Sequence, residues 1–217
     1  MTVYVVSAPS GAGKTTLNRR LLKECPQLEM SISHTTRPPR KGENEGDHYH
    51  FVSRKDFESM VQRQAFIEWA EVHGNLYGTT LDELQRIEKS GKSPLLEIDV
   101  QGWHKARPLL PQAISIFILP PSLQTLWQRL ESRGSDSLQA RWLRFQNALD
   151  EVKNAKDYDV FLVNRDLETS FHELKTLVLG AKPNPESQRE GVLLCEKLNE
   201  EFKTADWIKG LKQQLGG

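Results

Sequence analysis

The sequence has few of the features that mark secreted or membrane proteins. Of its 217 residues only two are cysteines, Cys25 and Cys195, and their separation fits neither a disulfide framework nor a metal-ligand motif. No apolar run approaches the roughly 20 residues that cross a bilayer, and no secretion signal precedes the first apolar segment. These absences favour a reducing compartment, and we expect a cytoplasmic protein.

The sequence also lacks an excess of charge of either sign. Lysine and arginine together number 29, as do aspartate and glutamate, so the formal net charge is zero. Proteins that bind nucleic acid or anionic membranes over a broad surface carry a large positive excess. We therefore expect neither nucleic acid nor a membrane as a partner, although this composition leaves room for a small basic pocket.

Short apolar runs alternate with segments of helical periodicity through most of the chain. The apolar runs, rich in β-branched and aliphatic residues, predict buried strands at residues 3–6, 95–99, 114–119 and 160–163. Helical periodicity predicts helices at residues 15–24, 56–64, 81–89, 123–133, 138–156 and 170–179. This alternation predicts an α/β fold with a mostly parallel sheet covered by helices on both faces.

The character of the sequence changes after residue 182. Pro183 and Pro185 interrupt the pattern and mark the end of the compact domain. Beyond them, apolar residues from Leu194 to Leu215 fall on one helical face that is broken near Ala205. We expect residues 183–217 to form a helical extension packed on the body or on a neighbouring subunit; the sequence leaves monomer and homo-oligomer open.

A glycine-rich loop joins the first predicted strand to the first predicted helix. Gly13, Lys14 and Thr15 match the phosphate-loop pattern of Gly, four residues, Gly, Lys and Ser or Thr, with Ala8 in place of the first glycine. In such loops backbone N–H groups face the phosphates, the lysine neutralises their oxygens, and the hydroxyl ligates Mg²⁺. The alternative is a turn that binds nothing, but the flanking strand and helix favour a nucleoside triphosphate site. The residues predicted to bind this nucleotide are Ser10, Gly11, Ala12, Gly13, Lys14, Thr15 and Thr16, with Thr15 as the metal ligand.

Two arginines lie three residues apart in a loop stiffened by prolines. Arg37 and Arg40 flank Pro38 and Pro39, and Tyr49 follows. Two guanidinium groups and a phenolic hydroxyl can clamp a phosphate dianion through charge-assisted hydrogen bonds. The alternative is a basic loop that is simply solvated.

Residues 31–51 read Ser-x-Ser-x-Thr-Thr-Arg-x-x-Arg-x-Gly-Glu-x-x-Gly-x-x-Tyr-x-Phe, which resembles the GMP-binding segment of guanylate kinases. Further segments similar to that family follow in the same order, at residues 66–70, 74–79, 96–102, 129–134 and 163–164. The resemblance covers residues 3–181. It implies a P-loop NTPase-type α/β kinase that uses Mg²⁺ and transfers the γ-phosphate of ATP to GMP or dGMP.

The resemblance also implies a role for individual residues. Those assigned to the GMP phosphate are Arg37, Arg40, Tyr49 and Tyr77. Those assigned to guanine are Ser33, Glu68, Thr79 and Asp99. Glu68 suits guanine because one carboxylate can accept hydrogen bonds from both N1–H and the 2-amino group. The implied catalytic cations are Lys14, Arg37, Arg133 and Arg144, and Arg129 is a further candidate. We expect the side chain of Arg141 to be solvated. Asn164 is assigned to ATP, on the adenine side.

By the same resemblance, residues 1–182 divide into three functional parts. These are a core (1–33, 92–126 and 158–182), a GMP-binding insertion (34–91) and a lid (127–157). We expect the insertion and the lid to close over the core when both substrates bind, because an open site would let water compete with GMP.

Two other functions fit parts of this pattern. A related phosphate-loop kinase that acts on a sugar phosphate would keep Lys14 but would not need Glu68. A guanylate-kinase-like interaction module without activity would bind phosphopeptides, and such modules typically lose residues of the phosphate loop.

Overall fold

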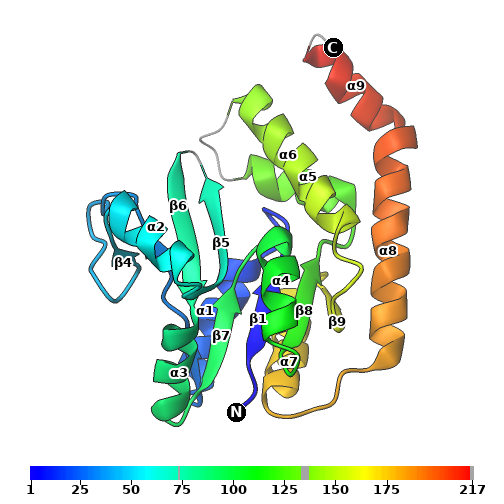
Figure 1. Cartoon of the computed structure of the whole chain (residues 1–217). Coiled ribbons are helices and arrows are strands. Elements are labelled where there is room, and N and C mark those ends of the chain that lie inside the picture. Colours follow the sequence, from blue (N-terminus) through cyan, green and yellow to red (C-terminus); the bar gives the residue numbers. More distant parts are fainter. Residues whose placement is uncertain (73, 133–136, 216–217) are drawn as a thin grey trace. The chain divides into compact units, whose positions relative to one another are not determined.

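The computed structural model describes residues 1–72, 74–132 and 137–215, in which strands and helices alternate (Figure 1). The strands are β1 (Tyr4–Ser7), β2 (Leu28–Met30), β3 (His34–Thr35), β4 (His50–Phe51), β5 (Phe66–Val72), β6 (Asn75–Thr80), β7 (Ser93–Glu97), β8 (Ile114–Leu119) and β9 (Val160–Val163). The helices are α1 (Lys14–Glu24), α2 (Arg54–Gln62), α3 (Leu81–Lys89), α4 (Val100–Ala106), α5 (Leu123–Glu131), α6 (Leu138–Lys153), α7 (Leu167–Val178), α8 (Pro185–Thr204) and α9 (Asp206–Gln214), with a 3₁₀ turn at Arg107–Leu109.

The larger sheet has five strands in the order β2-β7-β1-β8-β9. The pairs β2–β7 and β8–β9 are parallel, with Leu28 opposite Ser93 and Ile116 opposite Val160. All four residues of β1 are buried, as are Ser115–Leu119 of β8. Strands buried on both faces read as continuous apolar runs, which explains why the sequence predicts them. The predicted α/β fold with a mostly parallel sheet is confirmed.

A second sheet, in the order β4-β3-β6-β5, was not predicted. Its longest part is an antiparallel hairpin in which Glu68 pairs with Thr79 and Trp69 with Gly78. The side chains of Phe57 and Met60 on α2 pack against the sheet in one apolar cluster with Phe66 and Leu76. Because Trp69 and its neighbours are partly exposed, the hairpin lacks the apolar run that marks a buried strand.

Contacts between residues divide the chain into two compact units. The first contains Met1–Val5 and Cys25–Ile114, and the second contains Val6–Glu24 and the chain from Ser115 onward. The functional division into core, insertion and lid stays a prediction.

Capping residues lie at several of the ends where the observed elements differ from the predicted ones. The side chain of Asp99 accepts a hydrogen bond from the N–H of Gly102 and caps α4, so β7 ends before it. Asp166 likewise caps α7 through the N–H of Thr169, which starts the helix earlier than its apolar periodicity indicates. α6 ends at Lys153, three residues before the predicted end, and Asn154 follows as its C-cap residue.

The C-terminal helices, α8 and α9, are part of the second unit. In Figure 1, α8 runs beside β9 and α6, and it also contacts α5. A Cβ atom on Gly191 would lie 2.1 Å from the Cγ of Phe161, so α8 crosses β9 at close range. The ring of Phe202 stacks on Trp142 of α6, with centroids 5.8 Å apart. The predicted break is at Ala205, between α8 and α9.

Within the part of the chain that the structure describes, none of the helices is long and apolar enough to cross a membrane.

Candidate active site

The phosphate loop lies between β1 and α1, in the second unit. Gly11 and Gly13 have φ values of 95° and 101°, a region that favours glycine. The N–H of Ala12 donates to the carbonyl of Pro9 (3.0 Å), which closes a tight turn directly before Lys14 begins α1. Thr15 and Thr16 are exposed at the start of the helix. The loop therefore presents the N-terminus of a helix, which attracts anions.

Side chains from β9 and α5 hold this loop in place. Asn164 is buried directly after β9, and its Nδ2 donates to the carbonyl of Ala12 (2.7 Å). Arg129 of α5 donates to the carbonyls of Asn164 (3.0 Å) and Ala12 (3.5 Å). Burial lowers the pKa of Arg129. These carbonyls carry no formal charge to offset that of the guanidinium. Arg129 therefore places a positive charge at the phosphate loop.

The two arginines of α6, Arg141 and Arg144, have different surroundings. Arg144 donates from Nη2 to the hydroxyl of Ser10 (3.0 Å), so the structure brings this predicted lid residue to the loop. Arg141 was expected to be solvated, and this is wrong, because its side chain is 16% exposed and forms an ion pair with Glu131. Its guanidinium also lies over the ring of Trp127. Arg133 lies outside the described residues.

Replacing Gly13 with alanine is expected to damage this loop more than strain alone would. A Cβ atom there would lie 2.4 Å from the Nδ2 of Asn164, in addition to the positive φ. We expect Gly13→Ala to lower the free energy of unfolding by about 2 kcal/mol or more and to weaken ATP binding. Gly180→Ala is the matched control, since Gly180 has a φ of 103° and no atom near its Cβ position. Equal losses in thermal unfolding and unchanged ATP affinity would contradict the expectation.

In the first unit, three of the residues predicted to bind the GMP phosphate lie together at the arginine loop (residues 37–43). Arg37 donates from Nη2 to both carboxylate oxygens of Glu43 (2.9 and 3.0 Å) and from Nη1 to the carbonyl of Pro38. Its guanidinium lies 5.5 Å from the ring centroid of Tyr49, whose ring meets that of Tyr77 edge-on. Hydrogen bonding to Glu43 raises the pKa of Arg37 and lowers that of Glu43. Glu43 thus supplies an anion at the guanidinium predicted to bind phosphate.

The fourth of these residues, Arg40, lies differently. Its side chain is exposed, and its backbone N–H donates to Glu43 (2.7 Å). Hydrogen bonds between Thr36 and Leu76 attach the start of the loop to β6. The structure therefore brings Arg37, Tyr49 and Tyr77 together and leaves Arg40 at the exposed edge.

The four residues predicted to contact guanine also lie together in the first unit, and we call them the carboxylate site: Ser33, Glu68, Thr79 and Asp99. The N–H of Thr79 donates to the Oε1 of Glu68 (3.0 Å), and the hydroxyl of Thr79 shares a hydrogen bond with that of Ser33 (3.1 Å). A Cβ atom on Gly102 would lie 3.2 Å from the Oδ1 of Asp99 and 3.3 Å from the Oε2 of Glu68. Both carboxylates therefore border one bare stretch of backbone. This role of Gly102 was not predicted from the sequence, although Gly102 ends the segment at residues 96–102 that resembles the family.

The electrostatics of the carboxylate site are set by burial. Burial raises the pKa of Glu68, and the nearby charge of Asp99 raises it further, whereas Thr79 and Lys105 lower it. Its Oε2 is the carboxylate oxygen that faces Gly102. A half-buried carboxylate of this kind can accept hydrogen bonds from a ligand that offers donors.

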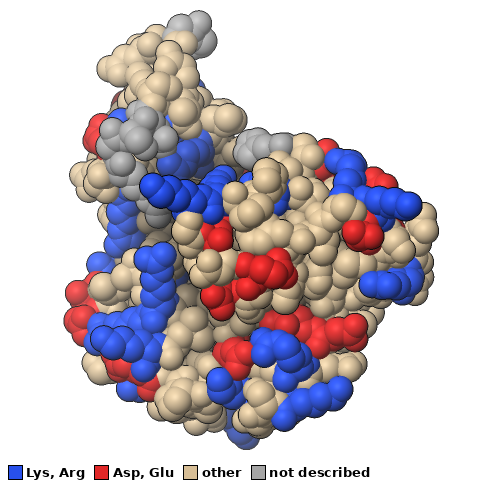
Figure 2. All heavy atoms as spheres, turned by 90° about the vertical axis from the view of Figure 1, so that its left-hand side faces the viewer, with Lys and Arg blue, Asp and Glu red and all other residues tan. Residues whose placement is uncertain are grey.

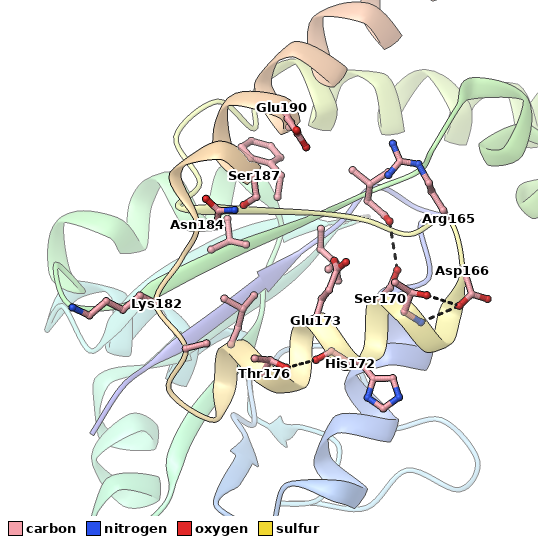
Figure 3. Close-up of a pocket in the computed structure, with 18 residues that line it drawn as sticks. Arg165, Asp166, Ser170, His172, Glu173, Thr176, Lys182, Asn184, Ser187 and Glu190 are labelled. Carbon is pink, nitrogen blue, oxygen red and sulfur yellow. Dashed lines mark hydrogen bonds between the residues drawn. The ribbon is translucent and has the colours of Figure 1, made fainter.

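A cavity of about 880 Å³ lies elsewhere in the second unit, between β9, α7 and the start of α8 (Figure 3). Phe161 and Leu177 form part of its apolar lining, and Figure 3 shows the side chain of Glu173 reaching from α7 toward β9. Its lining includes none of the residues predicted to bind nucleotide. Acidic and basic groups both border it, so its charge does not select one class of ligand.

Charged side chains of both signs are interspersed on the face shown in Figure 2.

Both cysteines are buried and form no disulfide with each other. Burial raises the pKa of Cys195 to about 12, so its thiol stays protonated near neutral pH.

Comparison with known proteins gives one consistent result. The profile of the guanylate kinase family matches residues 1–180. The guanylate kinase of Pseudomonas fluorescens is 46% identical over 199 residues, which cover 91% of this chain and 97% of that protein. That of Salmonella typhimurium is 43% identical over 201 residues, covering 91% and 97%. A crystal structure of guanylate kinase from Anaplasma phagocytophilum superimposes with a TM-score of 0.64 at 32% identity, covering 86% of this chain and 88% of the other. This chain belongs to the guanylate kinase family.

Proposed function

We propose that this chain transfers the γ-phosphate of ATP to GMP or dGMP, and that the residues described above carry out the reaction. The observation that supports this most directly is the carboxylate site, because the half-buried carboxylate of Glu68, held by Thr79, can accept hydrogen bonds from the donor edge of guanine. Membership of the guanylate kinase family supports the same reaction. The individual roles of the residues are our inference.

The phosphate loop would bind the triphosphate of ATP. Its backbone N–H groups and the start of α1 face an anion, and Lys14, Arg129 and Arg144 add positive charge around them. Phosphoryl transfer needs positioning and neutralisation of charge more than covalent chemistry by the protein. A general base is not required, because the acceptor phosphate of GMP is already anionic near neutral pH.

The donor set around Thr15 fits a Mg²⁺ ion that arrives with the nucleotide. Mg²⁺ prefers oxygen ligands and keeps several waters, so one protein hydroxyl beside phosphate oxygens is sufficient. Thr15 offers an exposed hydroxyl at the start of α1, and the described residues contain no cluster of three His, Cys, Asp or Glu side chains that could hold a metal alone. When bound, the ion would neutralise charge on the β- and γ-phosphates.

GMP would bind at the arginine loop and the carboxylate site. Its phosphate would compete with Glu43 for the guanidinium of Arg37, while Tyr49 and Tyr77 lie beside that group. Its guanine would donate N1–H and the 2-amino group to Glu68. Adenine has an acceptor at N1 and no 2-amino group, so it would leave the carboxylate poorly paired.

ADP formation from ATP and Mg²⁺ tests this function, with GMP, dGMP, AMP, CMP, UMP and ribose 1,5-bisphosphate offered one at a time. We expect turnover with GMP and dGMP and little with the other acceptors. Turnover with the sugar phosphate instead would make the chain a sugar-phosphate kinase. A folded protein that binds ATP or GMP but is inactive with every acceptor would point to an interaction module.

A further inference from the structure

Helix α4 presents one side to the strand that carries Glu68. Asp99, Gly102 and Lys105 are spaced three residues apart, which places them along one side of the helix. α4 packs on β5, and Gly102 borders the carboxylate of Glu68. Lys105 lies one turn further along this side and contacts Trp69, the residue that follows Glu68 in β5.

Lys105 is held at the backbone of β5. Its Nζ donates to the carbonyl oxygen of Trp69 (2.8 Å) and lies 5.7 Å from the centroid of the Trp69 ring. Trp69 itself pairs with Gly78 in the β5–β6 hairpin. The hydrogen bond and the ring together restrain the ammonium group beside the residue that follows Glu68.

We propose that Lys105 is a positioning residue for guanine recognition: anchored on Trp69, its ammonium group favours the ionised Glu68 carboxylate that receives the base. This inference rests on the proposed function, because it assigns guanine to Glu68.

The charges around Glu68 explain why such a cation has an effect. Asp99, at the start of α4, places a second negative charge near the same backbone, and Thr79 on β6 contributes neutral donors. Burial has the largest effect on the pKa of Glu68 and raises it, as does Asp99, whereas Thr79 and, to a smaller extent, the positive charge of Lys105 lower it. Lys105 is exposed, so solvent weakens its influence. We expect an effect of about two- to fivefold on GMP affinity, in the range of exposed ion pairs.

The test compares Lys105→Gln, which removes the charge, with Lys105→Arg, which keeps it. We would measure kcat/KM for GMP from about pH 5.5 to about pH 8.5. In Lys105→Gln the acid limb of the profile is expected to move toward higher pH, whereas Lys105→Arg follows the parent. The KM for ATP should not change. The difference should shrink at high salt, because salt screens exposed charges.

A merely structural role would give another result. If Lys105→Gln and Lys105→Arg lowered kcat/KM equally at every pH, Lys105 would only brace β5 and the inference would be overturned. An unchanged profile in Lys105→Gln would overturn it too. Lys92→Gln is the matched control, since Lys92 lies in the same unit and pairs with Glu29 on β2.

The titration of Glu68 can also be followed directly by NMR of ¹³C-labelled carboxyl groups, with its signal identified by its absence in Glu68→Gln. We expect the pKa of Glu68 to rise in Lys105→Gln and to stay near the parent value in Lys105→Arg. No change in Lys105→Gln would overturn the inference. Because this measurement needs no GMP, it tests Lys105 even if the protein does not turn GMP over, so the two failures are distinguishable.

Discussion

Replacing Glu68 with glutamine is expected to remove most of the preference for GMP and, at the same time, to stabilise the free protein. The amide oxygen of glutamine can still accept the N–H of Thr79, which now donates to Oε1. Its amino group, however, would face the two donors of guanine. Losing charge-assisted hydrogen bonds at such a site is expected to lower kcat/KM for GMP by about 10²- to 10⁴-fold. The KM for ATP should change little.

The gain in stability follows from the direction of the pKa shift. Burial raises the pKa of Glu68 in the folded protein, so the folded state holds its proton to higher pH than the unfolded state does. Ionising Glu68 therefore costs stability, and this cost is present above the folded-state pKa and disappears as the pH falls toward the unfolded value. Glutamine avoids it. We expect Glu68→Gln to unfold at higher temperature than the parent near neutral pH, with a difference that shrinks on acidification.

Glu71→Gln provides the control on the same strand, because Glu71 is exposed and pairs only loosely with Arg54. It should change neither GMP preference nor thermal stability by much. If Glu68→Gln kept the preference for GMP over AMP, the assignment of guanine to the carboxylate site would be wrong. If Glu68→Gln unfolded at a lower temperature than the parent, the ionised Glu68 would not lower the stability of the folded protein.

The sequence predicted the parts of the fold whose signal is local. β8 and β9 were placed at their observed bounds because each is a continuous apolar run between breakers. The β5–β6 hairpin was missed because Glu68, Trp69 and Glu71 give one partly exposed strand no regular alternation. Helix α4 was missed because seven residues are too few to show a helical period.

The candidate site divides in the same way. The phosphate loop could be predicted from its own residues, since it follows a strand, ends at Gly13 and leads directly into the helix that Lys14 begins. The guanine residues were assigned only by resemblance, because Ser33, Glu68 and Asp99 are far apart in the sequence. The approach of Gly102 to Glu68 and the contact of Lys105 with Trp69 depend on how the chain folds back. No local pattern encodes them.

Replacing Lys14 with methionine is expected to abolish most phosphoryl transfer without destabilising the protein. Lys14 is the first residue of α1, whose first turn contains no acidic residue. A cation at the N-terminus of a helix is unfavourable for the helix, because the helix dipole is positive there. The positive charge of Lys14 is therefore unfavourable in the free protein and favourable when an anion is bound, as expected for a functional site.

We expect kcat to fall by about 10²- to 10³-fold in Lys14→Met, as when a single donor to the transition state is lost. ATP binding should weaken much less, since the backbone N–H groups of the loop remain. Lys23→Met, in the last turn of the same helix, is the matched control: its cation is favourable for the helix dipole, and its loss should leave kcat unchanged and slightly lower stability. The rates come from single-turnover assays with GMP, and the stabilities from thermal unfolding without nucleotide. Should Lys14→Met lose kcat and thermal stability together, its effect would be structural; should it keep kcat, the phosphate loop would bind ATP without helping to transfer its phosphate.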